Sequence, residues 1–98
     1  MDRRSERRFV AEVQGSYQSA GAKSRNTYVS QISANGCRFN DQDGDLKPGD
    51  VIQMSLGQVG PFDATVRWAD DDMAGIEFHE TLDMAIVELF VAYCPFAA

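Results

Sequence analysis

Residues 62–79 read FDATVRWADDDMAGIEFH, and this stretch decides the fold class. From Phe62 to Trp68 every second residue is apolar, which is the pattern of a half-buried β-strand. Three consecutive aspartates at 70–72 then form a loop, and a second short strand is predicted over residues 75–79. The stretch therefore predicts two adjacent strands whose apolar faces, Trp68 included, lie in a core.

The same rhythm extends toward the N-terminus. Short runs rich in β-branched and aromatic residues alternate with turn signals, and they predict four earlier strands at about 9–17, 25–32, 37–40 and 51–56. Between the second and third, Ser33-Ala34-Asn35-Gly36 predicts a tight turn, because Asn-Gly readily adopts positive φ angles. Six strands are enough to close a small antiparallel barrel, which removes exposed sheet edges. The fold class is therefore expected to be all-β.

From Thr81 onward the apolar period changes to that of a helix. The spacing predicts one C-terminal α-helix over about residues 81–94, with Thr81 as its N-cap. Its apolar positions cover more than one stripe. The apolar surface beyond one stripe is covered either by an unidentified protein partner or by a second copy of the chain, or else the barrel itself wraps the helix more fully.

Length and composition limit the organisation of the chain. Its 98 residues suffice for one domain with one core, so we expect an arm over residues 1–8 and a barrel domain over residues 9–98. No apolar run approaches the ~20 residues that a membrane span requires, and no apolar segment typical of a signal peptide follows the N-terminus. These features predict a cytoplasmic protein without a membrane span.

The potential metal-binding and catalytic residues are few. Cys37 and Cys94 lack CxxC spacing, and His79 is the only histidine, so no metal site is expected. Cys37 lies in a predicted strand and Cys94 closes an apolar helical stretch, so both are expected to be buried thiols rather than a disulfide. A single histidine outside any catalytic pattern predicts that the protein is not an enzyme and needs no cofactor.

Basic residues are concentrated at the N-terminus. Four of the nine lie within the first eight positions: Arg3, Arg4, Arg7 and Arg8. With two acidic residues, positions 1–8 carry +2, so the rest of the net charge of −6 is −8. Guanidinium forks bind phosphates and guanine edges, so this segment is either an anion-binding arm or a solvated basic terminus. Nucleic acid is not an expected partner, because the acidic remainder repels long polyanions.

Several motifs occur in an order that resembles the PilZ family. Arg4-x-x-x-Arg8 precedes the first strand, and Gln31-x-Ser33-x-x-Gly36, continued by Phe39, precedes the third. Further similar segments follow: Lys47-Pro48-Gly49-Asp50, Val66-x-Trp68 and Gly75-Ile76-Glu77-Phe78. The resemblance covers residues 3–93. It implies a stand-alone, bacterial, six-stranded antiparallel PilZ-type β-barrel with a C-terminal α-helix that binds the second messenger cyclic di-GMP in signal transduction.

The resemblance also implies a ligand site formed by the arm and the turn. The candidate residues are Arg3, Arg4, Arg7, Arg8, Gln31, Ser33, Asn35 and Gly36. Arg4 and Arg8 fit better than Arg3 and Arg7, because the second arginine of the family motif usually stands directly before the first strand. Ser33 can donate its hydroxyl to a phosphate or to the backbone, and Gly36 permits a turn and close approach of a ligand.

Gln31 departs from the family pattern, which has Asp or Asn at this position. Glutamine places its acceptor one methylene further out and adds a rotamer to be ordered. A weakening of about 0.5–2 kcal/mol is expected from this change. The alternative is a PilZ-like protein–protein interaction adaptor that has lost nucleotide binding.

Overall fold

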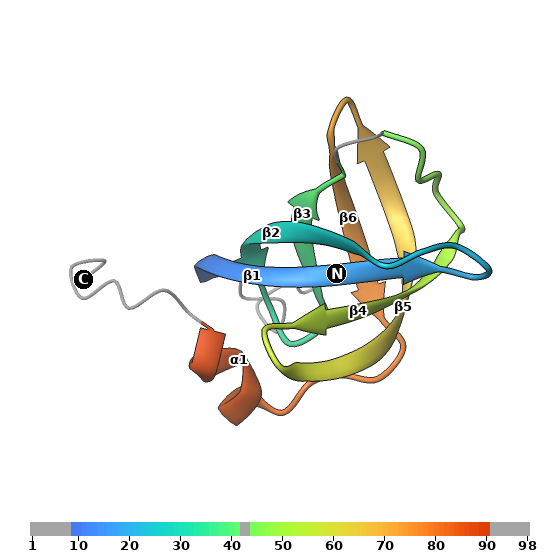
Figure 1. Ribbon diagram of the computed structural model, residues 1–98. Coiled ribbons are helices and arrows are strands. Elements are labelled where there is room, and N and C mark those ends of the chain that lie inside the picture. The colour runs from blue at the N-terminus through green and yellow to red at the C-terminus, as the bar shows by residue number, and fades with distance from the viewer. Residues whose placement is uncertain (1–8, 42–43, 91–98) are drawn as a thin grey trace, which may run out of the picture.

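The computed structural model describes residues 9–41 and 44–90. Six antiparallel strands form a closed barrel in the order β1-β2-β3-β6-β5-β4, and one short helix, α1, follows them (Figure 1). The strands are β1 (Phe9–Ser19), β2 (Arg25–Ile32), β3 (Gly36–Asn40), β4 (Val51–Leu56), β5 (Val59–Asp70) and β6 (Met73–Phe78), and α1 spans Met84–Phe90. The predicted fold class is confirmed.

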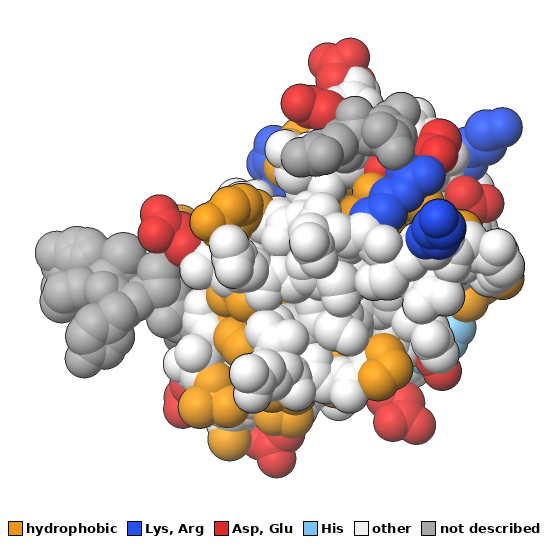
Figure 2. All heavy atoms as spheres, in the orientation of Figure 1, with side chains coloured by type: hydrophobic (Ala, Val, Ile, Leu, Met, Phe, Trp, Pro, Cys, Tyr) orange, Lys and Arg blue, Asp and Glu red, His pale blue; other side chains and the backbone are white. Residues whose placement is uncertain are grey.

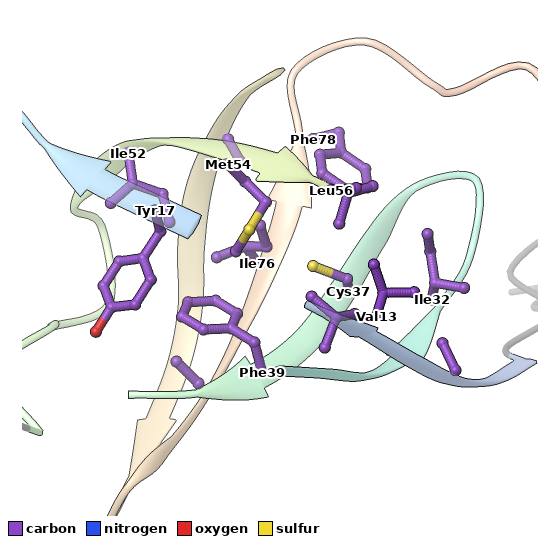
Figure 3. Close-up of a cluster of buried hydrophobic side chains, with 14 of the residues drawn as sticks. Val13, Tyr17, Ile32, Cys37, Phe39, Ile52, Met54, Leu56, Ile76 and Phe78 are labelled. Atoms are coloured by element: carbon purple, nitrogen blue, oxygen red, sulfur yellow. The ribbon is translucent and has the colours of Figure 1, made fainter. Parts of the chain in front are cut away.

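The barrel core comes from the alternation within the strands. Inward side chains from all six strands meet inside the barrel, where the rings of Tyr17 and Phe39 are tilted against each other with their centroids 4.9 Å apart (Figure 3). Val87 of α1 is fully buried and closes the core at the helix. Each fully buried aliphatic or aromatic side chain of this kind contributes roughly 1.5–3 kcal/mol through removal from water.

Cys37 is one of the buried core residues. It is a free thiol, as predicted, and its burial raises its pKa well above the ordinary value. The thiol therefore stays protonated at neutral pH and behaves as a small apolar side chain. The prediction for Cys94 concerns a position outside the described residues.

A buried carboxylate holds the chain that follows β3. Asp41 accepts a hydrogen bond of 2.6 Å from the Tyr17 hydroxyl and one of 3.1 Å from the backbone N–H of Leu46. Burial and the neighbouring Asp41 raise the pKa of Tyr17 above its usual range. These bonds satisfy a carboxylate that is 1% exposed and fix the start of the β3–β4 connection to β1.

Trp68 does not lie in the core as the alternation predicts. The pairing of β5 with β6 shifts register between Val66 and Trp68, so that Val66 faces Ile76 while Trp68 faces Gly75. A β-bulge of this kind places an extra residue on one strand and reverses the side on which the following side chains lie. Trp68 is consequently 39% exposed on the outside of the barrel.

The helix begins later than the spacing predicts. Asp83, not Thr81, caps it: the Asp83 carboxylate accepts from Ala85 N at 2.9 Å, and its carbonyl accepts from Val87 N at 3.2 Å. Thr81 instead donates to the side chain of Asn35 at 3.2 Å. Residues 91–94 of the predicted helix lie outside the described part of the chain. Among the described residues, no helix has the length and apolar character needed to cross a bilayer.

Candidate functional site

A groove of about 330 Å³ lies on the outer surface of the barrel, over the turn between β2 and β3 and the neighbouring strands β6 and β5. Four of the sequence-predicted site residues line it: Gln31, Ser33, Asn35 and Gly36. The other lining residues are Ile32, Cys37, Arg38, Arg67, Trp68, Gly75, Ile76 and Glu77. The structure therefore brings the predicted turn residues together with residues that are distant in the sequence.

The turn is organised around the side chain of Ser33. Its hydroxyl oxygen accepts hydrogen bonds from Asn35 N at 3.2 Å and Gly36 N at 3.1 Å, and it lies 3.3 Å from the Gly36 carbonyl, to which it donates. The backbone N–H of Ser33 also donates to that carbonyl, at 2.8 Å. The expected hydrogen bonds between the Ser33 hydroxyl and the backbone are therefore present.

Gly36 is required for a different reason from the one that the sequence suggested. Neither Asn35 nor Gly36 has a positive φ angle, so the expectation of a positive-φ Asn-Gly turn is wrong. A Cβ at Gly36 would instead overlap the carbonyl oxygen of Ile76 on the neighbouring strand β6. Glycine is needed because two backbones approach closely at the edge of the groove.

Trp68 and Arg38 form an aromatic and cationic surface in the groove. The Arg38 guanidinium lies 5.7 Å from the centre of the indole ring, within the range of a cation–π contact. A Cβ at Gly75 would overlap the indole, so the absence of a side chain there lets the ring lie close to the backbone of β6. Sequence reasoning did not include these three residues in the site, although Val66-x-Trp68 was part of the resemblance.

The charged residues of the groove are mostly basic. Arg67 Nε lies 3.1 Å from Glu77 Oε1, and both side chains are more than half exposed. Arg38, Arg67 and Glu77 together give the lining a charge of +1, whereas the chain as a whole carries −6. The groove is thus a locally basic region on an acidic protein, which favours an anionic ligand.

The predicted arm residues Arg3, Arg4, Arg7 and Arg8 lie outside the described residues. The position where the arm joins the barrel is nevertheless defined. Phe9, the residue after Arg8, pairs with Ile32, and Val10 pairs with Gln31, so β1 begins beside the groove. The described end of β1, to which the arm is joined, is therefore adjacent to this wall of the groove.

The turn also contacts the segment that leads to α1. The Asn35 carbonyl accepts from Phe78 N and the Ala34 carbonyl from Leu82 N, each at 2.7 Å. The Asn35 side chain accepts from the Thr81 hydroxyl at 3.2 Å. These three bonds tie the turn to residues 78–82, directly before the helix.

The described residues contain no group of three His, Cys, Asp or Glu side chains placed to hold a metal ion. In comparisons with known proteins, the sequence profile of the PilZ domain matches residues 2–95. No curated protein matches the chain. The matched range includes the whole barrel and the groove.

Proposed function

The chain belongs to the PilZ domain family, whose members are in general receptors for cyclic di-GMP rather than enzymes, and we propose that this protein is itself a cyclic di-GMP receptor. One observation carries the proposal: the Gln31-x-Ser33-x-x-Gly36 turn lines a basic groove with an exposed indole, beside the point where an arginine-rich arm joins the barrel.

The chemistry of the groove suits a guanine nucleotide. A purine base can stack on the face of Trp68, and the Arg38 guanidinium can stack on the base or contact a phosphate. Gly75 carries no side chain, so the Trp68 indole lies close to the backbone of β6, and Gly36 lets the backbones of β3 and β6 approach closely beside it. A base held in this way would be bound mainly by its face, with its edges available for hydrogen bonds.

The arm supplies the charge that a dianionic ligand requires. Arg4 and Arg8 present planar forks that match either a phosphate or the O6 and N7 acceptors of guanine. Arg3 and Arg7 add positive charge to the same short segment. The arm would order on the ligand, and the conformational entropy lost there reduces the affinity gained from the contacts.

Output is proposed to run through a partner, because the protein is proposed to have no catalysis of its own. Residues 78–82 are bonded to the turn and lead into α1, on which Met84 is exposed and Leu89 is 70% exposed. A protein partner or a second copy of the chain, in the bacterial cytoplasm, would bind this apolar helix surface when the ligand changes the turn.

A second candidate is an adaptor that binds a protein partner without a nucleotide. Two observations favour it: Gln31 replaces the Asp or Asn of the family motif, and Leu89 on α1 is 70% exposed. An adaptor would keep its partner after removal of the arm, whereas a receptor loses ligand when the arm is changed.

The test is calorimetric titration with cyclic di-GMP at physiological salt, for the natural protein, Arg8→Ala and Lys47→Ala. Lys47 is exposed and does not line the groove, so its variant controls for loss of one positive charge. A receptor binds at micromolar or lower concentration, loses binding in Arg8→Ala and keeps it in Lys47→Ala. No heat and no thermal shift with the natural protein would exclude the receptor and leave the adaptor.

A further inference from the structure

We propose that Glu77 determines base specificity, by accepting hydrogen bonds from the N1–H and N2–H groups of a guanine in the groove. The inference rests on the proposed function, because it concerns the same site. It assigns a role to a carboxylate that lies outside the family motifs for ligand binding and that sequence reasoning did not place in the site.

The position of Glu77 follows from the strand register. Glu77 lies on the outer face of β6, opposite Gly36 of β3 and Thr65 of β5. Because Gly36 has no side chain, nothing from that neighbouring position covers the carboxylate on the groove side. Gly75, beneath the Trp68 indole, is two residues earlier on the same strand face. Residues two apart on a strand are separated by about 6–7 Å, so Glu77 lies next to the place where a base stacked on Trp68 would be held.

Arg67 positions the Glu77 carboxylate but occupies only part of its hydrogen-bond acceptor capacity. The Arg67 Nε–Glu77 Oε1 distance is 3.1 Å, which engages one side of one oxygen. A carboxylate has about four lone-pair positions, so acceptor capacity remains for two further N–H donors. Arg67 also offsets the negative charge of Glu77, which would otherwise repel the phosphates of the ligand.

The chemistry of the bases explains why this carboxylate would select guanine. Of the described residues that line the groove, Glu77 alone is acidic. Guanine presents two donors, N1–H and N2–H, on its Watson–Crick edge, whereas adenine presents an acceptor at N1 and lacks the N2 amine. A carboxylate has only acceptors, so it pairs with guanine at both atoms and is repelled by the adenine N1.

The glutamine at position 31 is the reason for assigning recognition of guanine to Glu77 rather than to the turn. Gln31 lines the same groove, but its neutral amide offers one acceptor oxygen together with donors that oppose those of guanine. The charged acceptor that the family motif can supply at this position is absent here. Glu77 is the described groove residue that can replace it.

The test compares Glu77→Gln with the natural protein, titrated with cyclic di-GMP and with cyclic di-AMP. Trp68 is the single tryptophan of the chain, so its fluorescence reports occupation of the groove. We expect about a tenfold loss of affinity for cyclic di-GMP, the size of a lost pair of base contacts. Affinity for cyclic di-AMP should stay the same or rise, since glutamine pairs with adenine.

The direction of the affinity change in Glu77→Gln distinguishes recognition of the base from simple electrostatic repulsion of the ligand. Glu77→Gln removes a negative charge, so a carboxylate that only repels the ligand would give tighter binding of both nucleotides in the variant. The control is Glu12→Gln, which makes the same change at an exposed position on β1 outside the groove. It is expected to leave the preference for guanine unchanged.

Two results would overturn the inference, and they are distinguishable. If the natural protein binds cyclic di-GMP but Glu77→Gln keeps the full preference over cyclic di-AMP, Glu77 does not read the base and the receptor function stands. If the natural protein binds neither nucleotide, the proposed function itself fails and the inference fails with it. Thermal unfolding of the variant confirms that the exposed substitution leaves the barrel folded.

Discussion

The position of a single side chain, Trp68, decides whether the outer surface of the barrel carries an exposed aromatic ring. On a regular β5 strand this residue would alternate into the core, as its sequence pattern predicts. The bulge after Val66 turns it outward instead, and Gly75 leaves room for the indole against β6. In the proposed receptor, this side chain, 39% exposed and next to a guanidinium, would be the platform on which a base stacks.

Replacing Trp68 by leucine should weaken nucleotide binding and leave the fold intact. Loss of the stacking surface is expected to reduce the free energy of cyclic di-GMP binding by about 1–3 kcal/mol. The free energy of unfolding should change by about 1 kcal/mol or less, because the side chain is outside the core. Calorimetry and urea unfolding measure the two quantities separately.

Tyr28→Leu is the matched control for this substitution. Tyr28 is an exposed aromatic residue on β2 that does not line the groove. Its replacement should leave nucleotide affinity unchanged. Equal losses of affinity in the two variants would mean that the effect does not come from stacking in the groove.

At the scale of elements, the turn between β2 and β3 joins the groove to the helix. The backbone carbonyls of Ala34 and Asn35 accept from residues 82 and 78, and Thr81 bonds the Asn35 side chain. Asp83 then caps α1, and Val87 anchors it in the core. A ligand that moves the turn therefore acts directly on the residues before the helix, with no intervening element.

Thr81→Val should weaken this connection without removing groove residues. The lost side-chain hydrogen bond is expected to cost about 0.5–1.5 kcal/mol of stability and to increase amide hydrogen exchange across residues 82–90. Protection of α1 on addition of cyclic di-GMP should decrease, while affinity changes little. Hydrogen-exchange mass spectrometry with and without the nucleotide measures both effects.

Thr27→Val controls for the loss of a threonine hydrogen bond elsewhere. The Thr27 hydroxyl donates to the Asn40 carbonyl, at the ends of β2 and β3 that lie away from the turn. This variant should keep the ligand-dependent protection of α1. If Thr81→Val keeps it too, the turn does not transmit ligand binding through Thr81.

At the scale of the whole molecule, the sequence predicts the barrel better than the groove. Alternation and turn residues are local signals, and they located six strands and the turn at Ser33. The groove depends on strand order, because β6 lies between β3 and β5 although it follows both in the chain. Arg67 and Glu77 lie on consecutive strands, and Arg38 joins them only through that order. Likewise the bulge at Trp68 and the close approach at Gly36 depend on the partner strand.

Charge distribution over the whole molecule predicts discrimination between compact and extended anions. Residues 1–8 carry +2 and the other residues together −8, and acidic side chains lie around the edges of the face that β1 crosses (Figure 2). A cyclic dinucleotide in the groove is small enough to contact the basic arm and groove alone. A long single strand would extend over acidic surface, where it is repelled.

Single-stranded RNA of about 20 nucleotides, longer than the strand that a small barrel usually covers, should therefore not bind detectably. The measurement is fluorescence anisotropy of labelled RNA at about 0.01 M salt, where the Debye length is about 30 Å and any attraction is strongest. The same protein sample should bind cyclic di-GMP. Micromolar RNA binding that disappears as salt is raised would show that the arm acts as a general polyanion site, because release of condensed counterions gives that salt dependence. Binding of the dinucleotide alone means that the acidic barrel restricts the arm to compact ligands.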